Sequence, residues 1–127
     1  MGFGLPASIG AHIANPNNLI LNITGDGSFQ MNLQELATCR EHNIPIKIII
    51  MNNGYLGMVR QLQEKNCESR YSETKIQNPD FIKLCNSFGI DAIRVETREQ
   101  ILPALQKCFS DNKPFLIDFV IEAMEVV

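Results

Sequence analysis

The chain has 127 residues, of which 45% are hydrophobic and 20% are charged, and its formal net charge is -3. This length suits one compact domain, and the composition is typical of a folded globular protein rather than a disordered chain. Lys and Arg are scattered singly, so no basic stripe is available for binding a nucleic acid. No apolar run approaches a membrane span and no secretory signal opens the chain, so we expect an intracellular protein without a membrane partner.

Apolar runs alternate along the chain with segments of helical spacing. The runs at 19–24 and 46–51 are short, apolar and followed by turn residues, as buried parallel strands usually are. Asn32-Leu33-Gln34-Glu35 resembles a capping box at the start of a helix between them, and Asn78-Pro79-Asp80 is expected to cap a later helix. The expected elements, in chain order, are a helix over 5–14, a strand over 19–24, a helix over 33–40, a strand over 46–51, a helix over 80–88, a strand over 92–95, a helix over 97–109 and a strand over 115–121.

Strands that alternate with helices favour an α/β fold, namely an open, mostly parallel sheet with helices on both faces. The polar stretch 64–77 is expected to form a loop. We see no internal domain boundary, so residues 1–127 are expected to form one domain. Neither end carries a polar tail, from which we expect a fragment of a longer multidomain protein. The four cysteines are too widely spaced for a zinc site and are expected to be reduced structural thiols.

Two turns follow predicted strands at the ends where open parallel sheets bind their ligands. In Gly25-Asp26-Gly27-Ser28, the glycines permit a tight turn, and the amides of Gly27 and Ser28 are placed to face phosphate oxygens. In Asn52-Asn53-Gly54-Tyr55, the Asn53 amide and the Tyr55 carbonyl offer oxygens that, with Asp26, suit a hard cation such as Mg²⁺. Either turn alone is an ordinary turn sequence. Together they predict a metal that bridges protein oxygens to a diphosphate, in place of the missing basic cluster.

Gly25-Asp26-Gly27 followed by Asn52-Asn53 resembles the diphosphate motif of thiamine-diphosphate enzymes. Four further segments resemble the acetolactate synthase (acetohydroxyacid synthase) large subunit, and the similarity covers essentially the whole chain. These segments are Met1-Gly2-Phe3-Gly4-Leu5-Pro6-Ala7, Asn32-Leu33-Gln34-Glu35-Leu36-Ala37-Thr38, Leu56-Gly57-Met58-Val59-Arg60-Gln61 and Arg70-Tyr71-Ser72. The resemblance implies the C-terminal cofactor domain of a transferase that condenses pyruvate with a second 2-oxo acid in branched-chain amino-acid biosynthesis.

The resemblance also implies a role for individual residues. Magnesium would be held by Asp26, Asn53 and the Tyr55 backbone carbonyl, and Met1 would be a wedge under the thiazolium ring. Leu62 lies in the substrate region, where many members of the family have a tryptophan, so herbicide sensitivity and the choice of second substrate stay open. The residues expected to contact the cofactor are Met1, Gly25, Asp26, Gly27, Ser28, Asn53, Tyr55, Leu56, Gly57 and Met58.

Other implied features lie outside this chain. No catalytic residue is assigned here, because the family's activating glutamate belongs to an N-terminal domain across a dimer interface, and we expect the isolated domain to be inactive. FAD is expected only in a full-length protein. That protein is expected to be a homodimer or tetramer in the cytoplasm, or in the plastid stroma if it comes from a photosynthetic eukaryote, and the presence of a regulatory small subunit stays open. The alternatives are another thiamine-diphosphate-dependent 2-oxo acid decarboxylase or carboligase, and a non-catalytic magnesium- or nucleotide-binding module.

Overall fold

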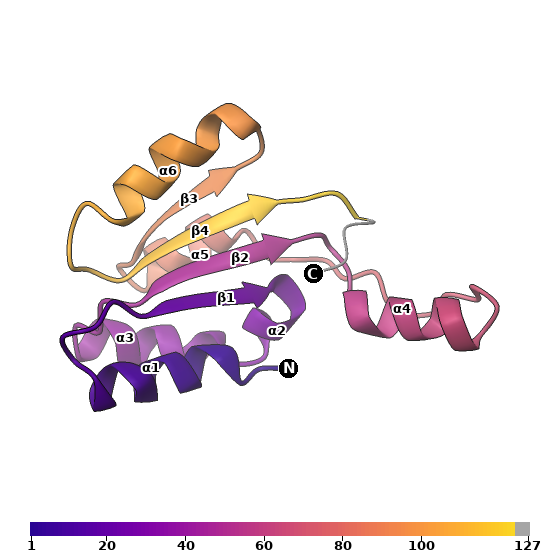
Figure 1. Ribbon diagram of the computed structural model, residues 1–127, viewed down its shortest axis with the longest axis horizontal. Coiled ribbons are helices and arrows are strands. Elements are labelled where there is room, and N and C mark those ends of the chain that lie inside the picture. The colour runs from indigo at the N-terminus through magenta and orange to yellow at the C-terminus, as the bar shows by residue number, and fades with distance from the viewer. Residues whose placement is uncertain (124–127) are drawn as a thin grey trace.

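A parallel sheet lies at the centre of the molecule (Figure 1). The computed structural model describes residues 1–123, and within them the sheet has four strands in the order β1-β2-β4-β3. All three strand pairs are parallel. The strands are β1 (Leu21–Gly25), β2 (Lys47–Asn52), β3 (Asp91–Val95) and β4 (Phe115–Val120).

Helices cover both faces of this sheet, and the predicted α/β fold is confirmed. One face packs against four helices, α1 (Gly4–Ala14), α2 (Asp26–Gln30), α3 (Leu36–Glu41) and α5 (Phe81–Ser87). The other face packs against α6 (Ile101–Cys108), which covers β3 and β4. Alternation along β2 explains the two cores, because Ile48 and Ile50 point towards the first group of helices. Within residues 1–123, no helix is long and apolar enough to cross a lipid bilayer.

The predicted capping box at Asn32 is wrong. Residues Leu33–Glu35 form a 3₁₀ turn before α3, and the Asn32 side chain makes no cap bond. It donates instead to the Gly2 carbonyl at 2.6 Å, a contact across 30 residues that no local pattern reveals. A capping box does occur at Thr97, where Gln100 Oε1 accepts from the Thr97 amide at 3.2 Å before α6 begins. A second 3₁₀ turn, Arg98–Gln100, follows that cap.

Two further expectations concern the segment between β2 and β3. Asp80 caps α5 as predicted, with its Oδ1 accepting from the amides of Ile82 and Lys83. The hydrogen bond from the Lys83 amide has the largest effect on the pKa of Asp80. Together with the bond from Ile82 and the nearby Lys83 ammonium, it holds that pKa below its usual value. Helix α4 (Gly57–Asn66) was not predicted, and it takes up the first residues of the expected loop at 64–77. No residue of α4 is buried, and its short apolar stripe, Met58, Val59 and Leu62, is exposed; the helix projects away from the sheet (Figure 1).

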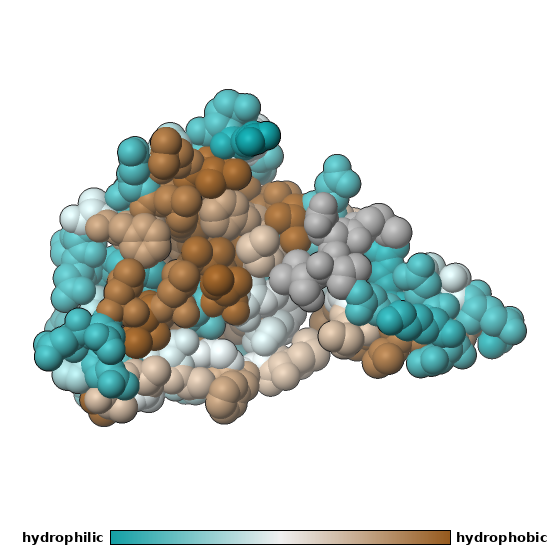
Figure 2. Space-filling view, in the orientation of Figure 1, coloured by the Kyte–Doolittle hydropathy of each residue, from teal (hydrophilic) through white to brown (hydrophobic). Residues whose placement is uncertain are grey.

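Part of the sheet face that carries α6 is bare. Ile23 of β1 lies beside Ile49 and therefore on that face, and 62% of its surface is exposed. Leu21 of β1 and Leu102 of α6 are also exposed. Figure 2 shows the apolar surface that results between β1 and α6. Among the described residues, β1 pairs only with β2 and is an edge strand.

The cysteines are unpaired thiols, as predicted. Cys39, Cys85 and Cys108 are buried in the cores, and Cys67 is half-buried after α4. Burial raises the pKa of Cys39 to about 11 and that of Cys85 to about 12. These two thiols are therefore uncharged at neutral pH and act as small apolar side chains.

Phe81→Ala is expected to lower the free energy of unfolding by about 3–5 kcal/mol. Phe81 is fully buried, and its ring meets that of Phe29 edge to face at 5.6 Å, so truncation leaves a cavity between α2 and α5. The measurement is urea unfolding followed by circular dichroism. Leu102→Ala is the control, since Leu102 is 64% exposed and its loss should change stability by less than about 0.5 kcal/mol. Equal losses for the two variants would contradict this account of the core.

Candidate functional site

A cavity of about 200 Å³ lies at the carboxyl ends of β1 and β2. All ten residues that the sequence predicted to contact a cofactor line it, and Met51 and Val59 complete its wall. Leu62, on the exposed part of α4, is not among the residues that line it. Among residues 1–123, no lysine or arginine lines the cavity, so an anion bound there needs another source of positive charge.

Parallel pairing brings the two turns together. Gly25 is in register with Met51, so the turn after β1 and the turn after β2 leave the sheet side by side. The second turn contains Gly54 at a φ of +70°, a left-handed conformation that glycine adopts without strain. This conformation directs the Gly54 amide at Asp26 Oδ2, with a donor–acceptor distance of 2.8 Å. One turn therefore holds the side chain of the other.

Asp26 is the centre of the site. Only 1% of its surface is exposed, yet within residues 1–123 no lysine, arginine or histidine pairs with it. Its hydrogen bonds come from uncharged donors: the Gly27 amide to Oδ1 at 2.8 Å, and the Gly54 amide and Asn78 Nδ2 to Oδ2 at 2.8 and 2.7 Å. A buried carboxylate usually requires a cation or several hydrogen bonds. Because Oδ1 accepts one bond, it keeps a lone pair for a metal.

Two further oxygens lie on the second turn. Asn53 Oδ1 accepts from the Tyr55 amide at 3.0 Å and orients the Asn53 side chain. A short antiparallel bridge joins this turn to the loop after α4. In it, the Leu56 amide donates to the Thr74 carbonyl and the Ile76 amide donates to the Gly54 carbonyl. Neither bond uses the Tyr55 carbonyl. Among the described residues, no group of three or more His, Cys, Asp or Glu side chains is arranged as a metal site. A metal here would rest on one carboxylate with amide and carbonyl oxygens, a donor set that suits Mg²⁺ rather than zinc.

Two polar groups of the first turn, the Gly27 amide and Ser28 Oγ, already make hydrogen bonds within the protein. The Gly27 amide, expected to face a phosphate, donates to Asp26 within the turn. Ser28 Oγ accepts from the Gly2 amide at 3.0 Å. Gly27 also permits close packing, since a Cβ at this position would lie 2.7 Å from Leu56 Cδ2. The turn and the first residues of the chain thus form one hydrogen-bonded unit beside the cavity.

Gly2 places Met1 at the cavity. Its amide is bound by Ser28, and its carbonyl accepts from Asn32 Nδ2 at 2.6 Å. Its φ of +75° turns the backbone so that Met1 reaches the cavity wall, where 67% of Met1 stays exposed. The Met1 side chain is therefore available to a ligand.

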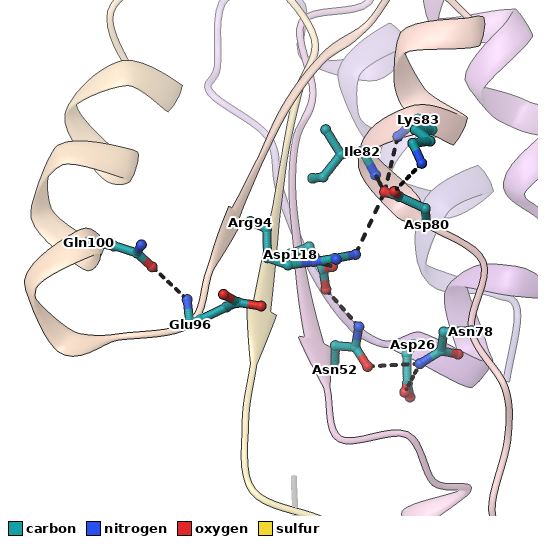
Figure 3. A network of polar contacts seen from close by, with 10 residues as sticks. All are labelled: Asp26, Asn52, Asn78, Asp80, Ile82, Lys83, Arg94, Glu96, Gln100 and Asp118. Carbon is teal, nitrogen blue, oxygen red and sulfur yellow. Dashed lines mark hydrogen bonds and ion pairs between the residues drawn. The ribbon is translucent and has the colours of Figure 1, made fainter.

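Sequence reasoning missed Asn78, which it treated only as part of a helix cap. Asn78 Nδ2 bonds both Asp26 Oδ2 at 2.7 Å and Asn52 Oδ1 at 2.8 Å (Figure 3). Asn78 lies 52 positions from Asp26 along the chain, so no local signal could have paired them. Asn52 in turn reaches Asp118, a buried residue of β4 that the sequence placed only in an apolar strand.

Comparisons with known proteins identify the family. The sequence profile of "Thiamine pyrophosphate enzyme, C-terminal TPP binding domain" matches residues 1–119. The chain belongs to this thiamine pyrophosphate enzyme family. It is 49% identical to the acetolactate synthase large subunit of Cyanidium caldarium over 98% of the chain and 22% of that relative. It is 44% identical to the acetolactate synthase isozyme 2 large subunit of Escherichia coli (strain K12) over 100% of the chain and 23% of that relative. These similarities confirm the resemblance found in the motifs.

A solved member of the thiamine pyrophosphate enzyme family has the same fold. The structure of the Rhodococcus jostii RHA1 thiamine diphosphate-dependent 4-hydroxybenzoylformate decarboxylase matches with a TM-score of 0.89 and 30% identity. The match covers 96% of this chain and 23% of that one. The chain thus spans less than a quarter of the length of each of these family members.

Gly2→Ala is expected to lower the free energy of unfolding by about 1–3 kcal/mol. An alanine here would need a left-handed backbone conformation. Its Cβ would also lie 2.8 Å from Asn32 Nδ2 and 3.0 Å from Met31 Cβ. Gly10→Ala, on an exposed turn of α1 with no atom within 4 Å of the new Cβ, is the matched control and should stabilise by up to about 1 kcal/mol. Urea unfolding measures both. A Gly2 variant as stable as the Gly10 variant would show that Gly2 does not hold Met1 in place.

Proposed function

We propose that this chain is the thiamine-diphosphate-binding domain of an acetolactate synthase large subunit, with the cofactor held through Mg²⁺ on Asp26, Asn53 and the Tyr55 carbonyl. The observation that carries the proposal is the buried Asp26 carboxylate, which has only uncharged donors and opens on a cavity without lysine or arginine. A divalent cation satisfies both needs at once, because it balances Asp26 and attracts a diphosphate. The similarity to acetolactate synthases at 44–49% identity supports the choice of cofactor and enzyme.

The chain's own residues bind and orient the cofactor. When bound, thiamine diphosphate supplies the electron sink for decarboxylation of a 2-oxo acid. Gly25, Gly27, Ser28 and the turn 55–58 would surround the diphosphate end. Met1 would support the thiazolium ring from below, since it is exposed at the cavity and held by Gly2. Apolar contact from Met1 and Met58 would exclude water from the reacting end of the cofactor.

The reaction itself would need parts of a longer protein. We propose that the chain is one domain of an acetolactate synthase that condenses pyruvate with a second 2-oxo acid, in the cytoplasm or the plastid stroma. The activating glutamate would come from another domain of a partner subunit, and FAD would belong to a middle domain. Exposed Met1 and Met58 at the cavity, with exposed Leu62 further along α4, support a subunit interface in a homodimer or tetramer. A regulatory small subunit would be a further partner.

A second candidate keeps the cofactor and changes the reaction. The likeness to a 4-hydroxybenzoylformate decarboxylase, at a TM-score of 0.89, favours a decarboxylase that releases an aldehyde. Its 30% identity is lower than the 44–49% shared with acetolactate synthases, so we place it second.

Asp26→Ala is expected to weaken the Mg²⁺-dependent binding of thiamine diphosphate by at least about 100-fold. Loss of a group that only hydrogen-bonds to a metal ligand already lowers metal affinity about 10- to 100-fold, and loss of the ligand itself should lower it more. Calorimetric titration of the protein with the cofactor, with and without Mg²⁺, measures it. Asp91→Ala is the control, because Asp91 is exposed at the start of β3, the far end of the sheet from the cavity. Cofactor binding by Asp26→Ala equal to wild type would contradict the metal assignment. Tight binding of a nucleotide in place of thiamine diphosphate would favour a nucleotide-binding module.

With thiamine diphosphate, Mg²⁺ and the remaining domains present, the protein is expected to convert two molecules of pyruvate into one acetolactate and one carbon dioxide. Acid conversion of acetolactate to acetoin followed by a colour reaction measures the product, and an aldehyde assay is run in parallel. Asp26→Ala is the inactive control. Release of aldehyde and carbon dioxide in equal amounts without acetolactate would instead support the decarboxylase.

A further inference from the structure

A chain of side-chain hydrogen bonds runs from the site into the core (Figure 3). Asn78 Nδ2 donates to Asp26 Oδ2 at 2.7 Å and to Asn52 Oδ1 at 2.8 Å. Asn52 Nδ2 donates to Asp118 Oδ1 at 2.9 Å. Asp118 is fully buried, and its Oδ2 accepts from Arg94 Nε at 2.9 Å. Three side chains, Asn78, Asn52 and Asp118, therefore connect the candidate metal ligand Asp26 to Arg94 on β3.

The charge of Asp118 decides which group donates and which accepts in every bond of this hydrogen-bond network. A carboxylate paired with Arg94 only accepts, so Asn52 must turn its Nδ2 towards Asp118 and its Oδ1 towards Asn78. Asn78 must then offer its Nδ2 to Asn52, and the same nitrogen reaches Asp26. At the far side of Asn78, Gln30 Nε2 donates to Oδ1 at 2.6 Å, which agrees with this orientation. The amide orientations follow from the network rather than from either asparagine alone.

This direction has a consequence for Asp26. Its Oδ2 receives two donors, from Asn78 and Gly54, which fix the plane of the carboxyl group. Its Oδ1 receives only the Gly27 amide. If Asn78 turned its carbonyl oxygen towards Asp26, two acceptors would face each other and the carboxylate would rotate or move. Asn78 is not among the residues that line the cavity, so it acts on a ligand through Asp26.

We propose that Asn78 is a positioning residue for the metal ligand Asp26, and that the buried Asp118–Arg94 pair, through Asn52, sets the orientation in which Asn78 works. The proposal rests on the proposed role of Asp26 in holding Mg²⁺. Residues that hydrogen-bond to metal ligands fix the geometry of those ligands and change metal affinity when lost. The polypeptide segment that carries Asn78 is also held through Asp80. Asp80 caps α5, and its Oδ1 lies 3.7 Å from Arg94 Nη2. The loop that brings Asn78 to the site is thereby held to the sheet by the arginine that pairs with Asp118.

The first test is the Mg²⁺ concentration that half-saturates thiamine-diphosphate binding, measured by calorimetry on the protein. Asn78→Ala is expected to raise this concentration about 10- to 100-fold. Asn86→Ala, an exposed asparagine on α5, is the matched control and should leave it unchanged. Urea unfolding without ligand is measured on each variant, because a merely structural role would lower stability and leave the Mg²⁺ requirement of the folded protein unchanged. An unchanged Mg²⁺ requirement in folded Asn78→Ala overturns the proposal.

The second test separates the orientation set by Asp118 from its charge. Asp118→Asn keeps the shape but allows the Asn52 amide to reverse, so it is expected to raise the half-saturating Mg²⁺ in the same direction as Asn78→Ala. Asp80→Asn also removes one carboxylate beside Arg94, keeps a good helix cap and leaves the hydrogen-bond chain intact, so it should have no such effect. Equal shifts in the two variants overturn the orientation argument. If Asn78→Ala does not fold, Asp118→Asn carries the test, since half-exposed Arg94 tolerates the loss of its partner.

The wild-type titration keeps the two proposals apart. Thiamine-diphosphate binding that does not depend on Mg²⁺, or no binding, overturns the proposed function and the role of Asn78 together. Mg²⁺-dependent binding that disappears in Asp26→Ala but is unchanged in the Asn78 and Asp118 variants overturns only the positioning role.

Discussion

Three hydrogen-bond donors converge on one buried carboxylate at the carboxyl end of β1. Asp26 is almost fully covered at the end of β1 and is held by the Gly27 amide, the Gly54 amide and the Asn78 side chain, none of which carries charge. Burial of a charge is unfavourable unless hydrogen bonds or a counterion compensate for lost hydration. Gly27 is the next residue in the chain, whereas the fold must bring Gly54 and Asn78 to Asp26 from 28 and 52 positions away. In the proposed function, the same arrangement leaves Asp26 Oδ1 with a lone pair for a cation.

Parallel strand order is what makes this convergence possible. Because β1 and β2 are neighbours and run in the same direction, their carboxyl ends open at the same edge of the sheet. The two turns need no contact in sequence to meet in space. The segment before α5 reaches the same edge of the sheet and contributes Asn78, which donates to Asp26 and to Asn52. Ligand geometry at this edge is thus a property of the sheet as much as of the turn residues.

Much of the fold could be predicted, because strand and helix periods are local. The strands were placed within a few residues, and the helices at α1, α5 and α6 followed from spacing and caps. Asp26 and Asn53 were predicted as ligands because each follows a strand within a recognisable turn, and the structure places both at the cavity. Helix α4 was missed because its start has no side-chain cap and its short apolar stripe, Met58, Val59 and Leu62, lies in a mostly polar segment. Asn32 was misread because its partner is Gly2, and Asn78 was overlooked because its partners lie 26 and 52 positions away.

The bare sheet face beside β1 separates two properties of the molecule in space. Ile23 and Leu21 are exposed along the edge strand β1, whereas the cavity lies at the carboxyl ends of β1 and β2. An edge strand with exposed apolar side chains and unpaired backbone groups is a template for contact with another chain. This exposed surface is separate from the residues that line the cavity. Selection on colloidal behaviour and selection on chemistry act on different residues, and either can change while the other stays constant.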